Sequence, residues 1–217
     1  MKRAAFSLRS HAPGPASSLQ TYYASHSHIY DATRWSFLFG RSTILELARA
    51  AQPGALRILE VGCGTGRNLV QLARLFPLAQ LTGVDLSAAM LDVARRKTAT
   101  YGSRISLTAR CYDAPLGQTG RYDLVLCSYT LSMFNPGLEA AIAAARADLA
   151  PHGHFALVDF HASRWRWFVR WMRVNHVRMD GHLLPLLRAN FSAVIEELHP
   201  AYGGVWDYCM FLGRKNP

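Results

Sequence analysis

The sequence predicts a single α/β domain with a doubly wound, mostly parallel, Rossmann-like sheet of seven strands. Three observations lead to this prediction. The chain has 217 residues, half of them hydrophobic, which suits one domain with a sizeable core. After Pro53-Gly54, apolar runs of strand length alternate with helical stretches, a pattern typical of parallel sheets with helices on both faces. A glycine-rich turn separates the first such strand from the next helix, where sheets of this kind bind ligands.

The predicted strands are short, rich in Val, Leu, Ile and aromatic residues, and bounded by turn residues. They cover residues 55–63, 79–87, 105–114, 122–131, 153–162, 193–200 and 206–214. Predicted helices cover residues 68–76, 88–102 and 136–150. The last two strands follow one another closely, so we expect them to be antiparallel.

The chain divides into three parts. Residues 1–18 are rich in Ser, Pro and Ala and are interpreted as a flexible tail. Residues 19–51 have apolar and aromatic side chains at helical spacing and are expected to form a helical lid. Residues 52–217 form the expected core.

Charge and composition narrow the class of partner. The net charge of +10 favours an anionic partner, such as an acidic substrate, nucleic acid or an anionic membrane surface. No apolar stretch approaches the ~20 residues that span a bilayer. The four cysteines are not in CxxC spacing, so we expect free thiols, and no metal site is predicted.

The glycine-rich turn is the strongest local signal. The text ILEVGCGTGRN carries Gly62, Gly64 and Gly66, and Glu60 precedes them in the strand. Glycines permit a tight turn and let the backbone approach a ligand closely. Asp85 ends the next strand, where a carboxylate can accept hydrogen bonds from ribose hydroxyls.

This pattern resembles motif I of class I S-adenosylmethionine-dependent methyltransferases, and the likeness extends over residues 55–160. The resemblance implies S-adenosylmethionine as cofactor, with S-adenosylhomocysteine as product. It places Asp85 on the ribose, Leu86 and Met90 near the adenine, and an acidic residue at the end of the third strand on the adenine amino group. The remaining cofactor-binding residues predicted on this basis are Asn68, Asp113, Ala114 and Ser128.

Two stretches that flank this core indicate the methyl acceptor. Residues 22–41 resemble the N-terminal lid of bacterial lipid N-methyltransferases, above all the diacylglyceryl-homoserine N-methyltransferase of betaine-lipid synthesis. Residues 158–174 lie where that group has a "VDFGD…RWF" element, with His161 in place of its glycine. The resemblance implies N-methylation of an amino lipid, in phospholipid or betaine-lipid metabolism, of diacylglyceryl-homoserine or phosphatidylethanolamine type.

Residues 163–178 are predicted to form a helix, and their first part, SRWRWFVRWMRV, holds three of the five tryptophans. On a helical wheel, Arg166, Arg170 and Arg173 lie together, and an apolar face carries Trp165, Phe168, Trp171 and Met172. A basic amphipathic helix is typical of peripheral membrane binding, with basic groups near anionic headgroups. Packing of the apolar face on the sheet is the alternative interpretation. Nucleic acid is not the expected partner, because no RNA-binding module is recognisable.

Several residues are candidates for the chemistry at the acceptor. Tyr129 and His161 follow strands whose ends should lie near the transferred methyl, so either is a candidate proton acceptor for an amine. Tyr30 and Arg34 are candidates for binding the cofactor from the lid, and Tyr30 is also a candidate for catalysis. Tyr22 and Arg41 are candidates for substrate binding, and Arg41 could pair with a carboxylate or a phosphate.

The function expected from these observations is repeated N-methylation of an amino-lipid headgroup. The enzyme is expected to be cytoplasmic and peripherally bound to the inner face of the membrane. Two alternatives stay open: C- or O-methylation of a lipophilic small molecule such as a quinone precursor, and an RNA-directed methyltransferase.

Overall fold

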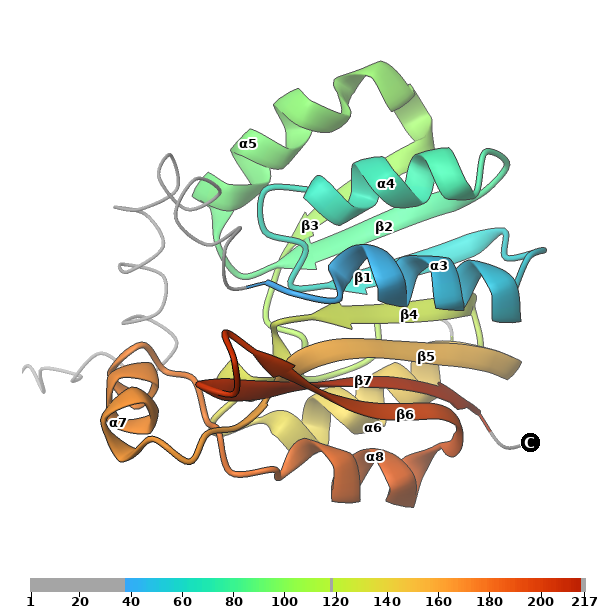
Figure 1. Cartoon of the computed structure of the whole chain (residues 1–217). Coiled ribbons are helices and arrows are strands. Elements are labelled where there is room, and N and C mark those ends of the chain that lie inside the picture. Colours follow the sequence, from blue (N-terminus) through green and yellow to red (C-terminus); the bar gives the residue numbers. More distant parts are fainter. Residues whose placement is uncertain (1–37, 118, 216–217) are drawn as a thin grey trace, which may run out of the picture.

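The computed structural model describes residues 38–117 and 119–215. They build one seven-stranded sheet in the order β3-β2-β1-β4-β5-β7-β6 (Figure 1). The first five strands in this order are mutually parallel, and β7 is antiparallel to β5 and β6. The strands are β1 (Arg57–Val61), β2 (Gln80–Asp85), β3 (Ile105–Ala109), β4 (Tyr122–Ser128), β5 (Leu149–Ala162), β6 (Ser192–Ala201) and β7 (Trp206–Arg214). The predicted fold class, including the antiparallel final pair, is confirmed.

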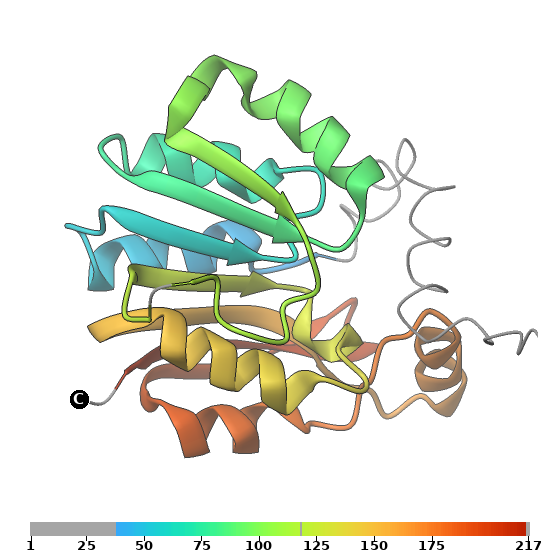
Figure 2. The same ribbon diagram turned by 180° about the vertical axis from the view of Figure 1, so that it is seen from behind.

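Helices cover both faces of the sheet (Figures 1 and 2). One face carries α3 (Arg41–Ala51), α4 (Arg67–Leu75) and α5 (Ala88–Thr98), and the other carries α6 (Leu138–Asp148) and α8 (Leu183–Asn190). The central strands are therefore buried on both sides, which explains their continuous apolar sequence. In β4, Leu124 and Leu126 join one buried cluster, and Val125 and Cys127 join the other.

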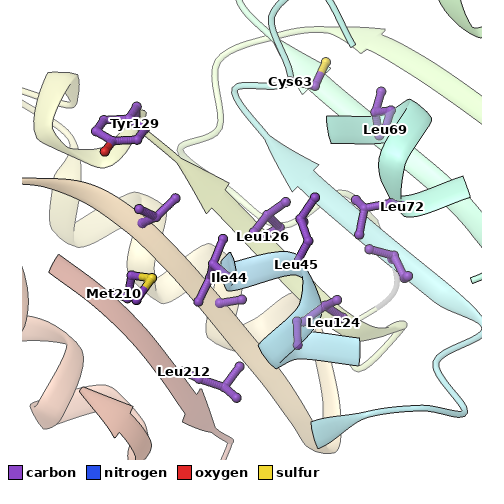
Figure 3. Packing of buried hydrophobic residues seen from close by; sticks show 14 of the residues in the cluster. Ile44, Leu45, Cys63, Leu69, Leu72, Leu124, Leu126, Tyr129, Met210 and Leu212 are labelled. Atoms are coloured by element: carbon purple, nitrogen blue, oxygen red, sulfur yellow. The ribbon is translucent and has the colours of Figure 1, made fainter. Parts of the chain in front are cut away.

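Helix α3 belongs to a packed layer of the fold. Its Ile44, Leu45 and Ala48 are fully buried, and the helix contacts β5, β7 and α4 (Figure 3). Residues 41–51 were predicted as part of a lid, but their apolar stripe covers the face of the sheet. The rest of the predicted lid, residues 19–37, lies outside the described residues, as does the predicted tail.

Helix α7 (Arg166–Val174) lies beyond the carboxyl-terminal end of β5 (Figure 1). It ends in a left-handed cap at His176 (φ 62°), where the His176 N–H donates to the Arg173 carbonyl and the Val177 N–H to that of Met172. The helix is therefore shorter than the predicted 163–178.

The predicted apolar face of α7 is split in the structure. Phe168 and Met172 are buried, and the Phe168 ring lies parallel to Trp206 with centroids 6.5 Å apart. Trp165, Trp167 and Trp171 are instead 44%, 63% and 48% exposed. The core therefore contacts only the narrow sector of the helix that holds Phe168 and Met172, and the tryptophans beside it stay exposed.

The four cysteines are free thiols, as predicted. Cys63, Cys127 and Cys209 are buried, and burial raises the pKa of each of them. Cys111, in the loop after β3, is exposed.

The split of α7 predicts different stability effects for its aromatic residues. Phe168→Ala should lower the free energy of unfolding by about 3 kcal/mol, because it leaves a cavity against Trp206. Trp167→Ala, at an exposed position, should change it by about 0.5 kcal/mol or less. Urea unfolding followed by circular dichroism measures both changes. Equal losses in the two variants would contradict the split.

Candidate active site

The glycine loop between β1 and α4 is built on left-handed backbone. Gly62, Gly64 and Gly66 have φ of 69°, 51° and 77°, which side chains other than glycine rarely adopt. A Cβ at Gly62 would lie 2.4 Å from the Thr130 side chain, and one at Gly66 would lie 3.0 Å from Ala94. A Cβ at Gly64 would meet nothing within 4 Å. Gly62 and Gly66 thus allow close packing of the loop, and the open side at Gly64 leaves room for a ligand.

Asp85 fixes this loop from the end of β2. Its carboxylate accepts hydrogen bonds from the Gly64 N–H and the Ser87 N–H, each at 2.8 Å. Burial raises the pKa of Asp85, and these hydrogen bonds oppose the shift. A carboxylate has about four acceptor sites, so capacity remains for a ribose hydroxyl. The geometry therefore fits the predicted ribose role and adds a second one, which is to hold Gly64.

Glu60 is a buried acid at the base of the loop. Asn68 Nδ2 donates to its Oε1 at 2.8 Å, and within the described residues Oε2 has no partner. Burial raises the pKa of Glu60 to about 8, against the lowering effects of Arg41 and Asn68. A buried carboxylate oxygen requires a donor. The amino group of an S-adenosylmethionine or S-adenosylhomocysteine molecule would supply one, so the residues present fit this cofactor.

The structure places two predicted residues in one chain of contacts with Glu60. Asn68, predicted to bind the cofactor, bridges Glu60 and Arg41, because Arg41 Nε donates to Asn68 Oδ1 at 3.2 Å. Arg41, predicted to bind a substrate anion, is directed to this amide by its place at the start of α3.

Tyr129, one of the two candidate proton acceptors, directly follows β4, as expected. It is buried in left-handed backbone (φ 55°), and its hydroxyl donates to the Phe39 carbonyl at 2.8 Å. Its ring packs edge-on against Phe160 at 4.7 Å. Burial raises its pKa, chiefly by desolvation. The geometry therefore gives Tyr129 a structural role, which local sequence could not reveal because Phe39 lies far along the chain.

His161 lies at an irregularity in the pairing of β5 with β7, among different neighbours from those of Tyr129. Its ring lies beside Gly181, and Arg188, Glu196 and Asp207 act on it electrostatically. Burial lowers its pKa, so the ring is neutral at pH 7 and able to accept a proton. The structure does not bring His161 and Tyr129 together as a pair.

Asp159 is a fully buried carboxylate in β5. It accepts hydrogen bonds from the backbone N–H groups of Thr130, Ser132 and Phe160 at 2.8–3.1 Å. Burial raises its pKa to about 6. Asp159 thereby fixes the turn after β4, and Thr130 in that turn packs on Gly62. The sequence analysis missed Thr130, which carries no motif of its own.

The other predicted cofactor residues lie at or beyond the carboxyl-terminal ends of β2, β3 and β4. Leu86 is half-buried, Met90 is buried and Asp113 and Ala114 are exposed. Ser128 Oγ is buried without a described partner. Their contacts with a cofactor stay predictions. Tyr22, Tyr30 and Arg34 lie outside the described residues. No cluster of three or more His, Cys, Asp or Glu side chains that could hold a metal ion occurs within residues 38–117 and 119–215.

Comparison with known proteins gives the class of this domain. Residues 58–153 match a family model described as a methyltransferase domain. A malonyl-[acyl-carrier protein] O-methyltransferase of Priestia megaterium is 36% identical over 106 residues, which is 48% of this chain and 37% of that protein. The matches span 30% to 43% of the length of the first five curated relatives.

Solved structures share the fold over nearly the whole chain. The 1,6-didemethyltoxoflavin-N1-methyltransferase of Burkholderia thailandensis, solved with S-adenosylhomocysteine, has a TM-score of 0.72 at 20% identity, over 97% of this chain and 94% of that one. The N-methyltransferase NodS of Bradyrhizobium japonicum, also with S-adenosylhomocysteine, has a TM-score of 0.73 at 19% identity, over 91% and 98%.

The sheet, the glycine loop and the matched family model all agree with a methyltransferase fold. Residues 58–153 are thus similar to methyltransferase domains, and the two solved structures named above, which share the fold, contain S-adenosylhomocysteine. The predicted resemblance to lipid N-methyltransferases gains no support from the relatives above.

The role of Asp85 predicts a loss of cofactor affinity on substitution. Asp85→Ala removes the ribose acceptor and releases Gly64, and should weaken S-adenosylhomocysteine binding by about 1–3 kcal/mol. Asp92→Ala is the matched control, because Asp92 is exposed and pairs with Arg95 on α5. Isothermal titration calorimetry compares the two. Unchanged affinity in Asp85→Ala would place the ribose elsewhere.

The burial of Glu60 predicts a dependence of stability on pH. In the cofactor-free protein its pKa of about 8 lies above the ordinary value of 4.5, so the folded state holds this proton more tightly than the unfolded state. The resulting stability is fully present below pH 4.5 and is lost as pH rises through about 8. Urea unfolding between about pH 5 and 9 measures this. The free energy of unfolding should fall less steeply with rising pH in Glu60→Gln than in the wild-type protein. Parallel pH profiles in the two proteins would contradict this.

Proposed function

We propose that this chain transfers methyl groups from S-adenosylmethionine to the amino group of a lipid headgroup at an anionic membrane surface. One observation carries the proposal. At the carboxyl-terminal end of the sheet, helix α7 presents exposed tryptophans next to a row of arginines. Because β1, β2 and β5 run parallel, the glycine loop and Asp85 lie at the same end of the sheet as α7.

The exposed surface of α7 has two sectors at about 100° per residue. Arg166, Arg170 and Arg173 share one sector, and Trp167, Trp171 and Val174 share the next. Trp165 precedes the helix and is also exposed. Tryptophan favours the boundary between lipid and water, and each arginine near an anionic surface contributes about 1 kcal/mol. This combination suits a helix that lies in the lipid interface.

The chemistry at the acceptor is simple. The bound cofactor supplies a methyl group on a sulfonium, so the protein's main task is to align the acceptor with it. An amine must arrive without its proton, and apolar surroundings favour the neutral form. His161, with a pKa below the ordinary value, is the candidate proton acceptor, directly or through water.

A second candidate function follows from the curated relatives. The Priestia megaterium relative is named for O-methylation of malonyl-[acyl-carrier protein], an acceptor that carries a carboxylate. The net charge of +10 also suits an acidic protein-bound substrate. A lipophilic quinone precursor and RNA are further acceptors that the same experiment covers.

The proposal implies peripheral association with the inner face of the membrane. Among the helices of the described residues, none has the length and apolar character needed to cross a bilayer. Binding through α7 would bring the enzyme to headgroups that never leave the membrane.

The test is an acceptor assay with the purified protein and methyl-labelled S-adenosylmethionine. Vesicles that contain phosphatidylethanolamine or diacylglyceryl-homoserine should gain label, and mass spectrometry should show lipids heavier by steps of one methyl group. Malonyl-[acyl-carrier protein], a quinone precursor and RNA are offered in parallel. Label in any of these and none in lipid would overturn the proposal.

Vesicle flotation with variants tests the membrane arm of the same proposal. The variant with Arg166, Arg170 and Arg173 changed to Gln should lose preference for anionic vesicles, whereas the same change at Arg57, Arg74 and Arg96 should not.

The double variant Trp165→Gln with Trp167→Gln should weaken vesicle binding even in 1 M salt, where the screening length falls to about 3 Å. Leu78→Gln is the apolar control, at an 81% exposed position before β2. Wild-type protein that stays in the soluble fraction with anionic vesicles would contradict the proposed membrane binding.

A further inference from the structure

A polar chain of three residues links the start of α3 to the cofactor site. Arg41 Nε donates to Asn68 Oδ1 at 3.2 Å, and Asn68 Nδ2 donates to Glu60 Oε1 at 2.8 Å. Asn68 and Glu60 are 2% and 1% exposed. The amide can serve both neighbours in one orientation only, because its oxygen must accept from the guanidinium and its NH₂ must donate to the carboxylate.

We propose that Arg41 is a positioning residue for the cofactor, which acts through Asn68 to hold the Glu60 carboxylate in place for the cofactor's amino group. The amide contact occupies Oε1 of Glu60, which leaves Oε2 without a partner among the described residues. An ammonium group is a donor that suits such an oxygen. Arg41 itself does not need to touch the cofactor.

The charges around Glu60 make Arg41 the cation that favours its ionised form. Burial is the largest influence and favours the protonated carboxyl, and Asp85 adds to it. Arg41 and the Asn68 hydrogen bond oppose both. The thiols of Cys63 and Cys127 also interact electrostatically with Glu60, but both are buried with raised pKa values and stay neutral.

The fold explains how Arg41 reaches this position. Gly40 precedes it in left-handed backbone, and the Phe39 carbonyl accepts a hydrogen bond from the Tyr129 hydroxyl. A Cβ at Gly40 would lie 2.7 Å from the Tyr208 ring, so the chain passes close to β7 just before α3 begins. These constraints place the first residue of α3 beside α4, where Asn68 lies.

The experiment is calorimetric titration with S-adenosylhomocysteine from pH 6.5 to 8.5, a roughly chosen window around the pKa of Glu60. Affinity of the wild-type protein should rise with pH as Glu60 ionises. In Arg41→Gln this rise should shift to higher pH by about one unit. Its affinity should then be about tenfold below wild type at pH 6.5 and about threefold below at pH 8.5. Arg41→Lys keeps the charge and should restore much of the profile.

Arg49→Gln is the matched control. Arg49 lies on the same helix as Arg41 and carries the same charge. Its side chain donates to the Leu75 carbonyl at 3.0 Å, at the end of α4, and is not part of the chain Arg41–Asn68–Glu60. Its substitution should leave the pH profile of binding in place. Asn68→Ala removes the link without removing either charge, and should shift the profile in the same direction as Arg41→Gln.

A loss of affinity in Arg41→Gln that is equal at every pH, or an equal shift in Arg49→Gln, would overturn the proposal. If Arg41→Gln does not fold, Arg41→Lys and Asn68→Ala still decide it. The titration contains no methyl acceptor. Its result is therefore independent of whether the acceptor is a lipid, and the two proposals can fail separately.

Discussion

The buried carboxylate of Asp159 is the interaction on which much of the site depends. It accepts hydrogen bonds from three backbone N–H groups and thereby fixes the turn after β4. In that turn, the Tyr129 hydroxyl donates a hydrogen bond to the Phe39 carbonyl, and Thr130 packs on Gly62. The Ser132 carbonyl accepts a hydrogen bond from the N–H of Arg178, in the segment after α7. A single charge thus connects the glycine loop, the start of α3 and the region of α7. With a pKa of about 6, it stays mostly ionised at neutral pH.

The sequence predicted the elements whose signals are local. Strand runs, the glycine turn and Asp85 could be found from residue type and spacing, and the sheet follows from them. The roles of Tyr129 and α7 could not be found in this way. A helical wheel gives angles between residues of one helix, but the sector that docks depends on Trp206, more than thirty positions later. The hydroxyl of Tyr129 likewise has a partner 90 residues away.

The two halves of the sheet differ in how far they resemble known proteins. The family match covers residues 58–153, which hold the glycine loop, Asp85 and the first four strands. Most of β5 and everything after it, including α7, β6 and β7, lie beyond this match, although the fold continues to agree with solved methyltransferases. Residues 58–153 include the cofactor-binding residues that were predicted for the core.

The distribution of the four thiols has a practical consequence. Three are enclosed in the core, where a maleimide cannot reach them, and Cys111 alone among the four lies in an exposed loop. That loop follows β3 and is two residues from Asp113, at the same end of the sheet as the glycine loop. The native protein can therefore be labelled at one defined point without any substitution. A fluorophore there would lie two residues from Asp113, so it could test the predicted position of the adenine.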